Sequence, residues 1–147
     1  MHDDANDVAA IEALIRRQFF SLDWRPGKSA DWDSFTADFF PDALLYPASR
    51  PAKRQTVQEF VERMKGLSGT KLESFHEVVL GNEIRVFGNV AVALAACEMT
   101  ENDAQVNRGV EMMLFVKSDG EWRIVAQAWD TEDGGKAIPA TLLNTTP

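Results

Sequence analysis

The 147-residue chain has a single cysteine, Cys97, and two histidines, His2 and His76. One thiol excludes an internal disulfide, and one cysteine with two histidines is too few for a Cys/His metal site. The chain has no glycine-rich phosphate loop, nucleophile elbow or Cys–His pair. We therefore expect no metal site and no cofactor.

Positive charge is also scarce. There are 15 Lys and Arg against 23 Asp and Glu, so the formal net charge is −8, and the basic residues form no cluster. Such a surface repels phosphate backbones and anionic lipids, so neither nucleic acid nor a membrane is an expected partner. No apolar run approaches the roughly 20 residues of a membrane span, and the acidic start lacks the basic region of a signal peptide. We expect a cytoplasmic protein.

The chain does have enough apolar sequence for one domain. Hydrophobic residues make up 45% of it, and a chain of this length can bury a sizeable core. We assign residues 1–147 to a single domain with a core at about 7–131. The tail, 132–147, is rich in Gly, Pro and Thr and is expected to lie loosely on the surface.

Helical spacing is confined to the first half. Apolar residues recur every three or four positions from Val8 to Leu22, and Pro26-Gly27 ends that pattern. Three further elements are expected before residue 70: a short helix from about Ser29 or Asp31 through Phe40, a short strand Leu44–Tyr46, and a helix Thr56–Leu67.

Strand patterns follow from Leu72 onward. Turn residues at Gly88-Asn89, Asn102-Asp103 and Asp119-Gly120 divide this half of the chain. The strands expected between them are Leu72–Phe87, Val90–Thr100, Arg108–Lys117 and Glu121–Asp130. Three successive hairpins predict an antiparallel meander. The chain is therefore of the α+β class, with three helices packed on a strongly bent sheet.

The turns also predict the pairing register. They place Asn82 opposite Ala95, Ala95 opposite Glu111, and Glu111 opposite Ala128. Directly opposed residues share a face, so one carboxylate lies among small neighbours on the face that the helices cover. Met113 fills space further along this face. A cavity beside Glu111 is the consequence, and a carboxylate buried there would have a raised pKa and could act as an acid or base.

The opposite face of the sheet is apolar as well. The helices can cover only one face, so we expect the other to form a homodimer. A single β-bulge would exchange the two faces beyond it. The residues expected on this outer face include Val92, Leu94, Val110, Met112, Leu114 and Val125.

The element order and several phrases resemble the nuclear transport factor 2-like superfamily, including its SnoaL-like branch, over about residues 7–131. The phrases are Phe40-Pro41-Asp42-Ala43, Arg108-Gly109-Val110, Gly120 to Val125, and Ala128-Trp129-Asp130. The resemblance implies a cystatin-like α+β cone, a partial barrel with an internal pocket, commonly dimeric through the sheet. It does not imply one activity, because that superfamily hosts isomerases, dehydratases, epoxide hydrolases and cyclases.

Candidate site residues follow from this geometry. Glu111, Asp130 and His76 are the candidate catalytic groups, since carboxylates and histidine carry most acid–base chemistry. The candidate ligand-binding residues are Tyr46, Asn82, Cys97, Met113 and Trp24. Six of them have a structural alternative: Glu111 as a structurally paired or rim carboxylate, His76 as a surface strand residue, Asp130 as a turn-capping residue, Cys97 as a small buried hydrophobe, and Tyr46 and Trp24 as core aromatics.

Two function classes stay open at this point. One is a cofactor-independent acid–base enzyme, of isomerase, dehydratase or cyclase type, acting on a small apolar or cyclic molecule. The other is a non-catalytic module that uses the same pocket for binding or dimerisation. A buried Glu111 with a second polar group in hydrogen-bond reach would favour the enzyme, whereas a pocket filled by Met113, Phe115 and Trp122 would favour the module.

Overall fold

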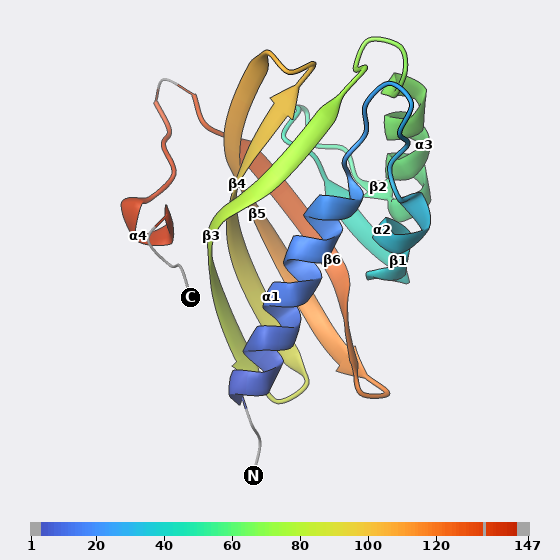
Figure 1. The fold of residues 1–147 in the computed structure, drawn as a ribbon. Coiled ribbons are helices and arrows are strands. Elements are labelled where there is room, and N and C mark those ends of the chain that lie inside the picture. The colour runs from blue at the N-terminus through green and yellow to red at the C-terminus, as the bar shows by residue number, and fades with distance from the viewer. Residues whose placement is uncertain (1–3, 134, 144–147) are drawn as a thin grey trace.

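The computed structural model describes residues 4–133 and 135–143. Figure 1 shows one bent sheet with helices against it. The helices are α1 (Asp4–Ser21), α2 (Trp32–Ala37), α3 (Val57–Leu67) and α4 (Ala140–Leu143). The strands are β1 (Phe39–Tyr46), β2 (Gln55–Thr56), β3 (Phe75–Phe87), β4 (Val90–Glu101), β5 (Gln105–Ser118) and β6 (Glu121–Thr131). Among the described residues, no helix has the length and apolarity needed to cross a membrane.

The sheet has the strand order β2-β1-β6-β5-β4-β3. Strands β3 to β6 pair antiparallel in sequence, which confirms the expected meander. Strand β1 then joins β6 in parallel, and the short β2 pairs antiparallel with β1 at the edge. Helix α1 lies across one face of the bent sheet, and α2 and α3 lie beside β1 and β2 (Figure 1). The α+β fold class is confirmed.

Local signals explain the helix bounds. Helix α3 begins at a capping box, in which Thr56 Oγ1 accepts from the Glu59 amide at 3.1 Å and Glu59 Oε1 accepts from the Thr56 amide at 2.9 Å. The expectation that α2 runs through Phe40 is wrong. The helix ends at Ala37, and Phe39 pairs with Ile124 of β6. Aromatic residues suit a strand, and here sheet pairing overrides their helical spacing.

The hairpin turns lie where the sequence predicts them. Gly88, Asn102, Asp103, Asp119 and Gly120 all have positive φ, between 53° and 79°. These are the residue types that adopt this backbone region at least cost, so they fix where each strand reverses. The predicted pairs on both sides of β4 are confirmed: Asn82 lies opposite Ala95, and Ala95 lies opposite Glu111.

Two β-bulges shift the register in the flanking strands. In β3, Val79 pairs with Cys97 and Gly81 with Ala96, so Leu80 is the extra residue. In β6, Leu114 pairs with Ala126 and Phe115 with Ile124, so Val125 is extra. The predicted pairing of Glu111 with Ala128 is therefore wrong, and Trp129 lies opposite Glu111.

The bulges exchange the faces of the residues beyond them. Glu77 on β3 and Gln127 on β6 are brought to the inner face, where each is about 5% exposed. The predicted register places Asp130 opposite Gly109 on the inner face, but it pairs with Val110 on the outer face. The one-residue shift at each bulge thus decides which polar side chains of β3 and β6 face the interior.

The main core lies between the inner face and the helices. It has a dense end, where Phe115 and Ile124 are fully buried and Trp122 donates from Nε1 to Asp7 Oδ1 at 3.0 Å. Lys117 Nζ donates to the same oxygen at 2.9 Å, so Asp7 fastens the start of α1 to the hairpin between β5 and β6. The opposite end of the same layer holds the polar cluster described below.

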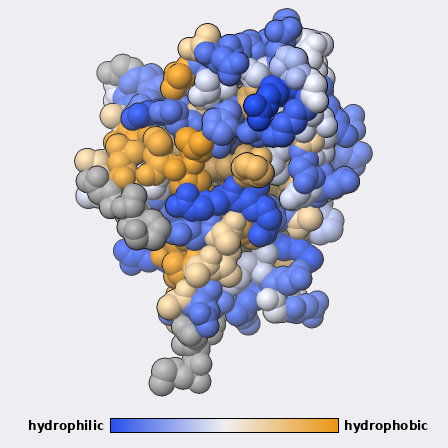
Figure 2. Space-filling model, viewed as in Figure 1, coloured by the Kyte–Doolittle hydropathy of each residue, from blue (hydrophilic) through white to orange (hydrophobic). Residues whose placement is uncertain are grey.

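The C-terminal segment does not lie loosely. Ile138 and Leu142 are 8% and 4% exposed and pack with Ala96 of the outer face into a second small cluster. The bulged Leu80 is one of the partly buried residues against that cluster. Figure 2 shows apolar side chains gathered on the side of the molecule where α4 lies. The tail therefore covers part of the face that the sequence assigns to the dimer.

Candidate active site

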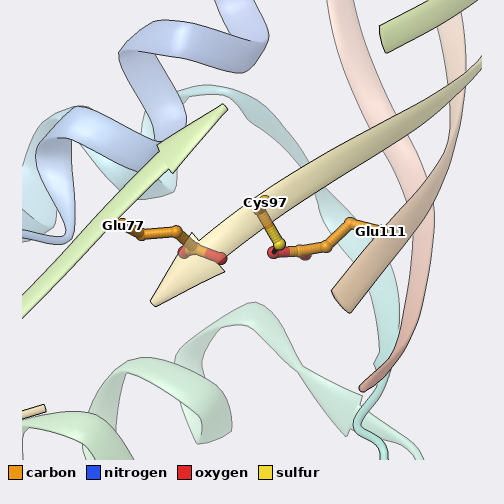
Figure 3. A group of neighbouring side chains, drawn as sticks. All are labelled: Glu77, Cys97 and Glu111. Carbon is orange, nitrogen blue, oxygen red and sulfur yellow. Dashed lines mark hydrogen bonds between the residues drawn. The ribbon is translucent and has the colours of Figure 1, made fainter. Parts of the chain in front are cut away.

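Three adjacent strands bring Glu77, Cys97 and Glu111 together on the inner face. Glu77 extends from β3 and Glu111 from β5, and their carboxyl groups point toward each other with the Cys97 sulfur between them (Figure 3). The possible donor atoms of the three residues all lie within 4.8 Å of one another. All three side chains are buried, at 5%, 1% and 7% exposure.

A chain of amides holds Glu111 from the other side. Gln127 donates from Nε2 to Glu111 Oε1, and its own Oε1 accepts from Gln18 Nε2 at 2.9 Å. Gln18 lies on α1 and is 1% exposed. The helix thus orients the Gln127 amide so that its donor, rather than its acceptor, faces the carboxylate.

The two carboxyl groups have raised pKa values. Burial raises the pKa of Glu77 well above its ordinary value, and the negative charge of Glu111 raises it further. Burial also raises the pKa of Glu111, but hydrogen bonds from Glu77 and Gln127 partly oppose this. The two groups therefore titrate as a coupled pair, and the ionised state is less costly at Glu111 than at Glu77.

A cavity of about 200 Å³ opens beside this pair. Glu77, Glu111 and Gln127 form its polar part, and Glu77 Oε2 is buried with no hydrogen-bond partner among the described residues. The rest of the lining is mainly apolar and aromatic. It includes Phe19, Leu22, Phe35, Leu45, Phe60, Met64, Leu67, Leu72, Phe75, Met99 and Trp129, with Arg63 and Glu101 as further charged groups.

The possible ligand atoms of Glu77, Cys97 and Glu111 are close enough to bind one metal ion, but the Cys97 thiol is held in its protonated form. Burial first, and then the charges of the two glutamates, raise the pKa of the Cys97 thiol far above its ordinary value. A thiol must lose its proton to bind a metal. The thiol instead lies 3.6 Å from the carbonyl oxygen of Gly109 and 4.0 Å from Glu111 Oε2, as a weak donor. The absence of a metal site stays a prediction.

Of the sequence-predicted residues, Glu111 and Cys97 are part of this cluster. Asn82 and Met113 are buried on the inner face but do not line the cavity. Trp24 is 2% exposed, stacks on Phe75 at 5.1 Å between ring centroids and donates from Nε1 to the Leu72 carbonyl at 2.9 Å. It supports the wall behind Phe75 rather than the mouth of the cavity.

The other three candidates, Asp130, His76 and Tyr46, lie elsewhere and do not line the cavity. Asp130 is on the outer face because of the β6 bulge, and it forms an ion pair with Lys136 at 2.9 Å. The hydrogen bond from Lys136 lowers the pKa of Asp130, opposite to what a neutral-pH acid requires. His76 is exposed and its Nδ1 lies 3.1 Å from Asp23 Oδ2. Tyr46 is 41% exposed, because Leu45 is the β1 residue that faces inward.

Sequence reasoning missed Glu77, Gln127 and Gln18. The first two are assigned to the outer face by strict alternation, and each lies beyond a bulge. Gln18 had a usable signal, because it interrupts the apolar stripe of α1 between Ile15 and Phe19. A polar residue within such a stripe must find a buried partner, and here that partner is Gln127.

Comparison with known families agrees with this architecture. The model of a family described as "putative lumazine-binding" matches residues 6–130. The chain belongs to this family. No curated protein matches the chain.

Solved structures show the same fold at low sequence identity. A "putative scytalone dehydratase" from Novosphingobium aromaticivorans superposes with a TM-score of 0.72 at 15% identity, covering 88% of this chain and 87% of that one. A protein of unknown function with a cystatin-like fold from Nostoc punctiforme gives 0.70 at 15%, covering 91% and 97%. An NTF2-like protein of unknown function from Pseudomonas putida KT2440 gives 0.70 at 14%, covering 100% of both chains.

These structures confirm the nuclear transport factor 2-like resemblance and the cystatin-like fold of this putative lumazine-binding family member. At such identities they establish the fold alone. The site must therefore be interpreted from its own geometry.

Proposed function

We propose that the chain is a cofactor-independent acid–base enzyme acting on a small cyclic carbonyl compound. The observation that carries the proposal is the facing pair, Glu77 and Glu111, buried beside a cavity with raised pKa values. Two coupled groups with unequal pKa values supply an acid and a base at the same pH.

The proposed roles assign one proton of the pair to Glu77, whose pKa is raised well above its ordinary value. Glu111, ionised and held by Gln127, removes a proton from a carbon next to the substrate carbonyl. Glu77 gives its proton to the carbonyl oxygen, so the product of this step is a neutral enol. After this step Glu111 holds the abstracted proton and Glu77 is ionised. If the enol is conjugated with a second double bond, Glu111 gives its proton to the far carbon while the enol O–H returns its proton to Glu77, which gives isomerisation. If the carbon beyond carries a hydroxyl, Glu111 gives its proton to that group, which leaves as water while the enol O–H returns its proton to Glu77, which gives dehydration.

The size of the cavity limits the substrate. Ligand pockets for drug-sized molecules usually measure roughly 300–1,000 Å³, whereas this cavity holds about 200 Å³. Aromatic walls and a polar floor favour one or two fused rings with one oxygen directed at the carboxyl pair. Met113, Phe115 and Trp122 belong to the packed core and leave this cavity open.

The proposal can be tested without knowing the natural substrate. 2-Tetralone is a bicyclic ketone with acidic protons beside its carbonyl, and their exchange in D₂O is followed by proton NMR. We expect the protein to accelerate exchange, Glu111→Gln to reduce the acceleration at least 100-fold, and Glu77→Gln to reduce it less. Glu83→Gln, an exposed change on the same strand as Glu77, should have no effect. Exchange no faster with the wild type than with Glu111→Gln would refute the proposal.

A second candidate is a binding module for a planar heterocycle, and the description of the family favours it. Lumazine carries N–H and C=O groups along one edge, which the Gln127 amide and the carboxyl pair could match. In this case lumazine fluorescence would change on titration, and Glu111→Gln would alter affinity while no tetralone exchange is seen with any variant. Tetralone exchange by the wild type that is lost in Glu111→Gln would instead support the enzyme.

A further inference from the structure

The cavity has one cationic group in its lining, Arg63 of α3. Its guanidinium carbon lies 5.4 Å from the centroid of the Phe60 ring, and Nη2 donates to Gln55 Oε1 at 3.4 Å. Stacking on an aromatic face is a favoured environment for a guanidinium. The ring and the amide therefore hold Arg63 in place against the apolar wall.

Arg63 differs from other basic residues at the edges of this core. Arg17 pairs with Asp38 at 2.7 Å, and Lys117 pairs with Asp7 at 2.9 Å. Across residues 4–133 and 135–143, no carboxylate forms an ion pair with Arg63, although the chain has a net charge of −8. Desolvation by neighbouring groups lowers the pKa of Arg63, yet its side chain is exposed and a guanidinium stays charged in proteins. This charge is open to pairing with an anion that enters the cavity.

The other charged group of the lining, Glu101, restricts how many anionic groups can enter. Glu101 Oε1 accepts from Asn107 Nδ2 at 3.1 Å, so a neutral donor rather than a cation holds this carboxylate. A ligand with two anionic groups would meet repulsion from Glu101 and from Glu111. The lining therefore favours one negative charge, placed at Arg63.

We propose that the cavity takes a planar one- or two-ring carboxylic acid, whose carboxylate pairs with Arg63 while an oxygen at its other end reaches Glu77 and Glu111. The ring lies among Phe35, Phe60 and Trp129. A carboxylate is planar and matches the two parallel donors of a guanidinium. This inference rests on the proposed function for the role of the carboxyl pair, and Arg63 supplies the selectivity.

Two probes differ only in the anionic group: 2-naphthol, and 6-hydroxy-2-naphthoate, which adds a carboxylate at the far end of the same ring system. Fluorescence titration should show the naphthoate binding at least tenfold tighter than the naphthol. Arg63→Met, which keeps an unbranched apolar stem, should abolish this preference. Lys65→Met, an exposed cation on the same helix outside the cavity lining, should retain it.

Salt provides a second readout, because the preference for the naphthoate should diminish as ionic strength rises while binding of the naphthol does not. Equal affinity of the two probes for the wild type, a preference that survives Arg63→Met, or binding of neither probe would overturn the inference. 2-Tetralone is neutral, so its exchange tests the acid–base function independently of Arg63. Exchange without naphthoate preference would refute the anion site alone.

Discussion

Glu77 on β3 and Glu111 on β5 point toward each other across β4 and are both buried, although each would carry a negative charge in water. The Gln127 amide donates to Glu111, a cavity adjoins the pair, and burial raises both pKa values, which favours protonation. Such a pair destabilises the fold whenever both members are ionised. A buried pair that costs stability beside a cavity is more consistent with a functional site than with packing.

The first prediction concerns stability and pH. The folded pKa values of Glu77 and Glu111 are raised above the ordinary 4.5, so the folded state binds more protons than the unfolded state. Their contribution to stability is therefore full below about pH 4.5 and is lost as pH rises through the folded pKa values. Glu77→Gln should remove most of this loss, which amounts to about 1.4 kcal/mol for each unit of pKa shift.

Denaturant unfolding near pH 5 and near pH 8 measures this effect. The free energy of unfolding of Glu77→Gln, minus that of the wild type, should be more positive at pH 8 than at pH 5. Glu83→Gln, at an exposed site, should change both values equally. A wild type that becomes more stable relative to Glu77→Gln as pH rises would show that the carboxyl pair is not destabilised by ionisation.

The second prediction concerns Gln127 as a positioning residue. Its Nε2 donor stabilises the ionised form of Glu111 and lowers its pKa. Gln127→Leu should therefore raise the pKa of Glu111, and the pH profile of tetralone exchange should move to higher pH. Gln58→Leu, an exposed change on α3, is the matched control. A reduced rate with an unmoved profile would indicate a packing role only.

The third prediction concerns Gly109 on β5. A Cβ atom there would overlap the Asp130 carbonyl oxygen and lie 3.3 Å from Thr131 Cα, both on the neighbouring strand. Because backbone rather than a flexible side chain blocks the space, Gly109→Ala should destabilise the protein by about 1–3 kcal/mol. Gly66→Ala, in α3 with nothing within 4 Å, should instead stabilise it by about 0.5 kcal/mol. Thermal unfolding of both variants tests this, and equal effects would contradict it.

The sequence was informative where one local signal determines the geometry. The turn residues with positive φ fixed all three hairpins, and the pairing of Ala95 with Glu111 followed from counting back from them. The site was only half predictable, because the two β-bulges carry no such local signal. Val125 and Leu80 look like ordinary strand residues, and nothing in their chemistry marks them as bulges. Whatever lies beyond them, including Gln127, Glu77 and Asp130, was assigned to the wrong face.

The C-terminal segment shows a second limit. Its Gly, Pro and Thr content favours a loose tail, but Ile138 and Leu142 are buried on the outer face. Two apolar residues within a polar segment are sufficient when an apolar sheet face lies within reach. Composition averaged over the segment concealed them.

The fourth prediction concerns what remains uncovered on that outer face. Val92, Met112 and Leu114 lie on neighbouring strands and are 43%, 55% and 43% exposed, so the C-terminal segment does not shield them. We propose that a second copy of the chain covers them. Val92 and Leu114 are paired across β4 and β5, with Met112 two residues along β5, so the three form a continuous apolar patch. Burying it in a homodimer removes the patch from water on both copies at once.

Sedimentation at micromolar concentration tests this arrangement. The wild type should sediment as a dimer of the 16.4 kDa chain. Leu114→Lys should yield a folded monomer, because dimerisation would bury each new lysine charge against the apolar patch of the other copy. Phe20→Lys, at a 72% exposed position on α1, should leave the dimer intact. A wild-type monomer at that concentration would refute the pairing, as would a Leu114→Lys variant that still sediments as a dimer. Circular dichroism of the variants, matching the wild type, ensures that association rather than folding is compared.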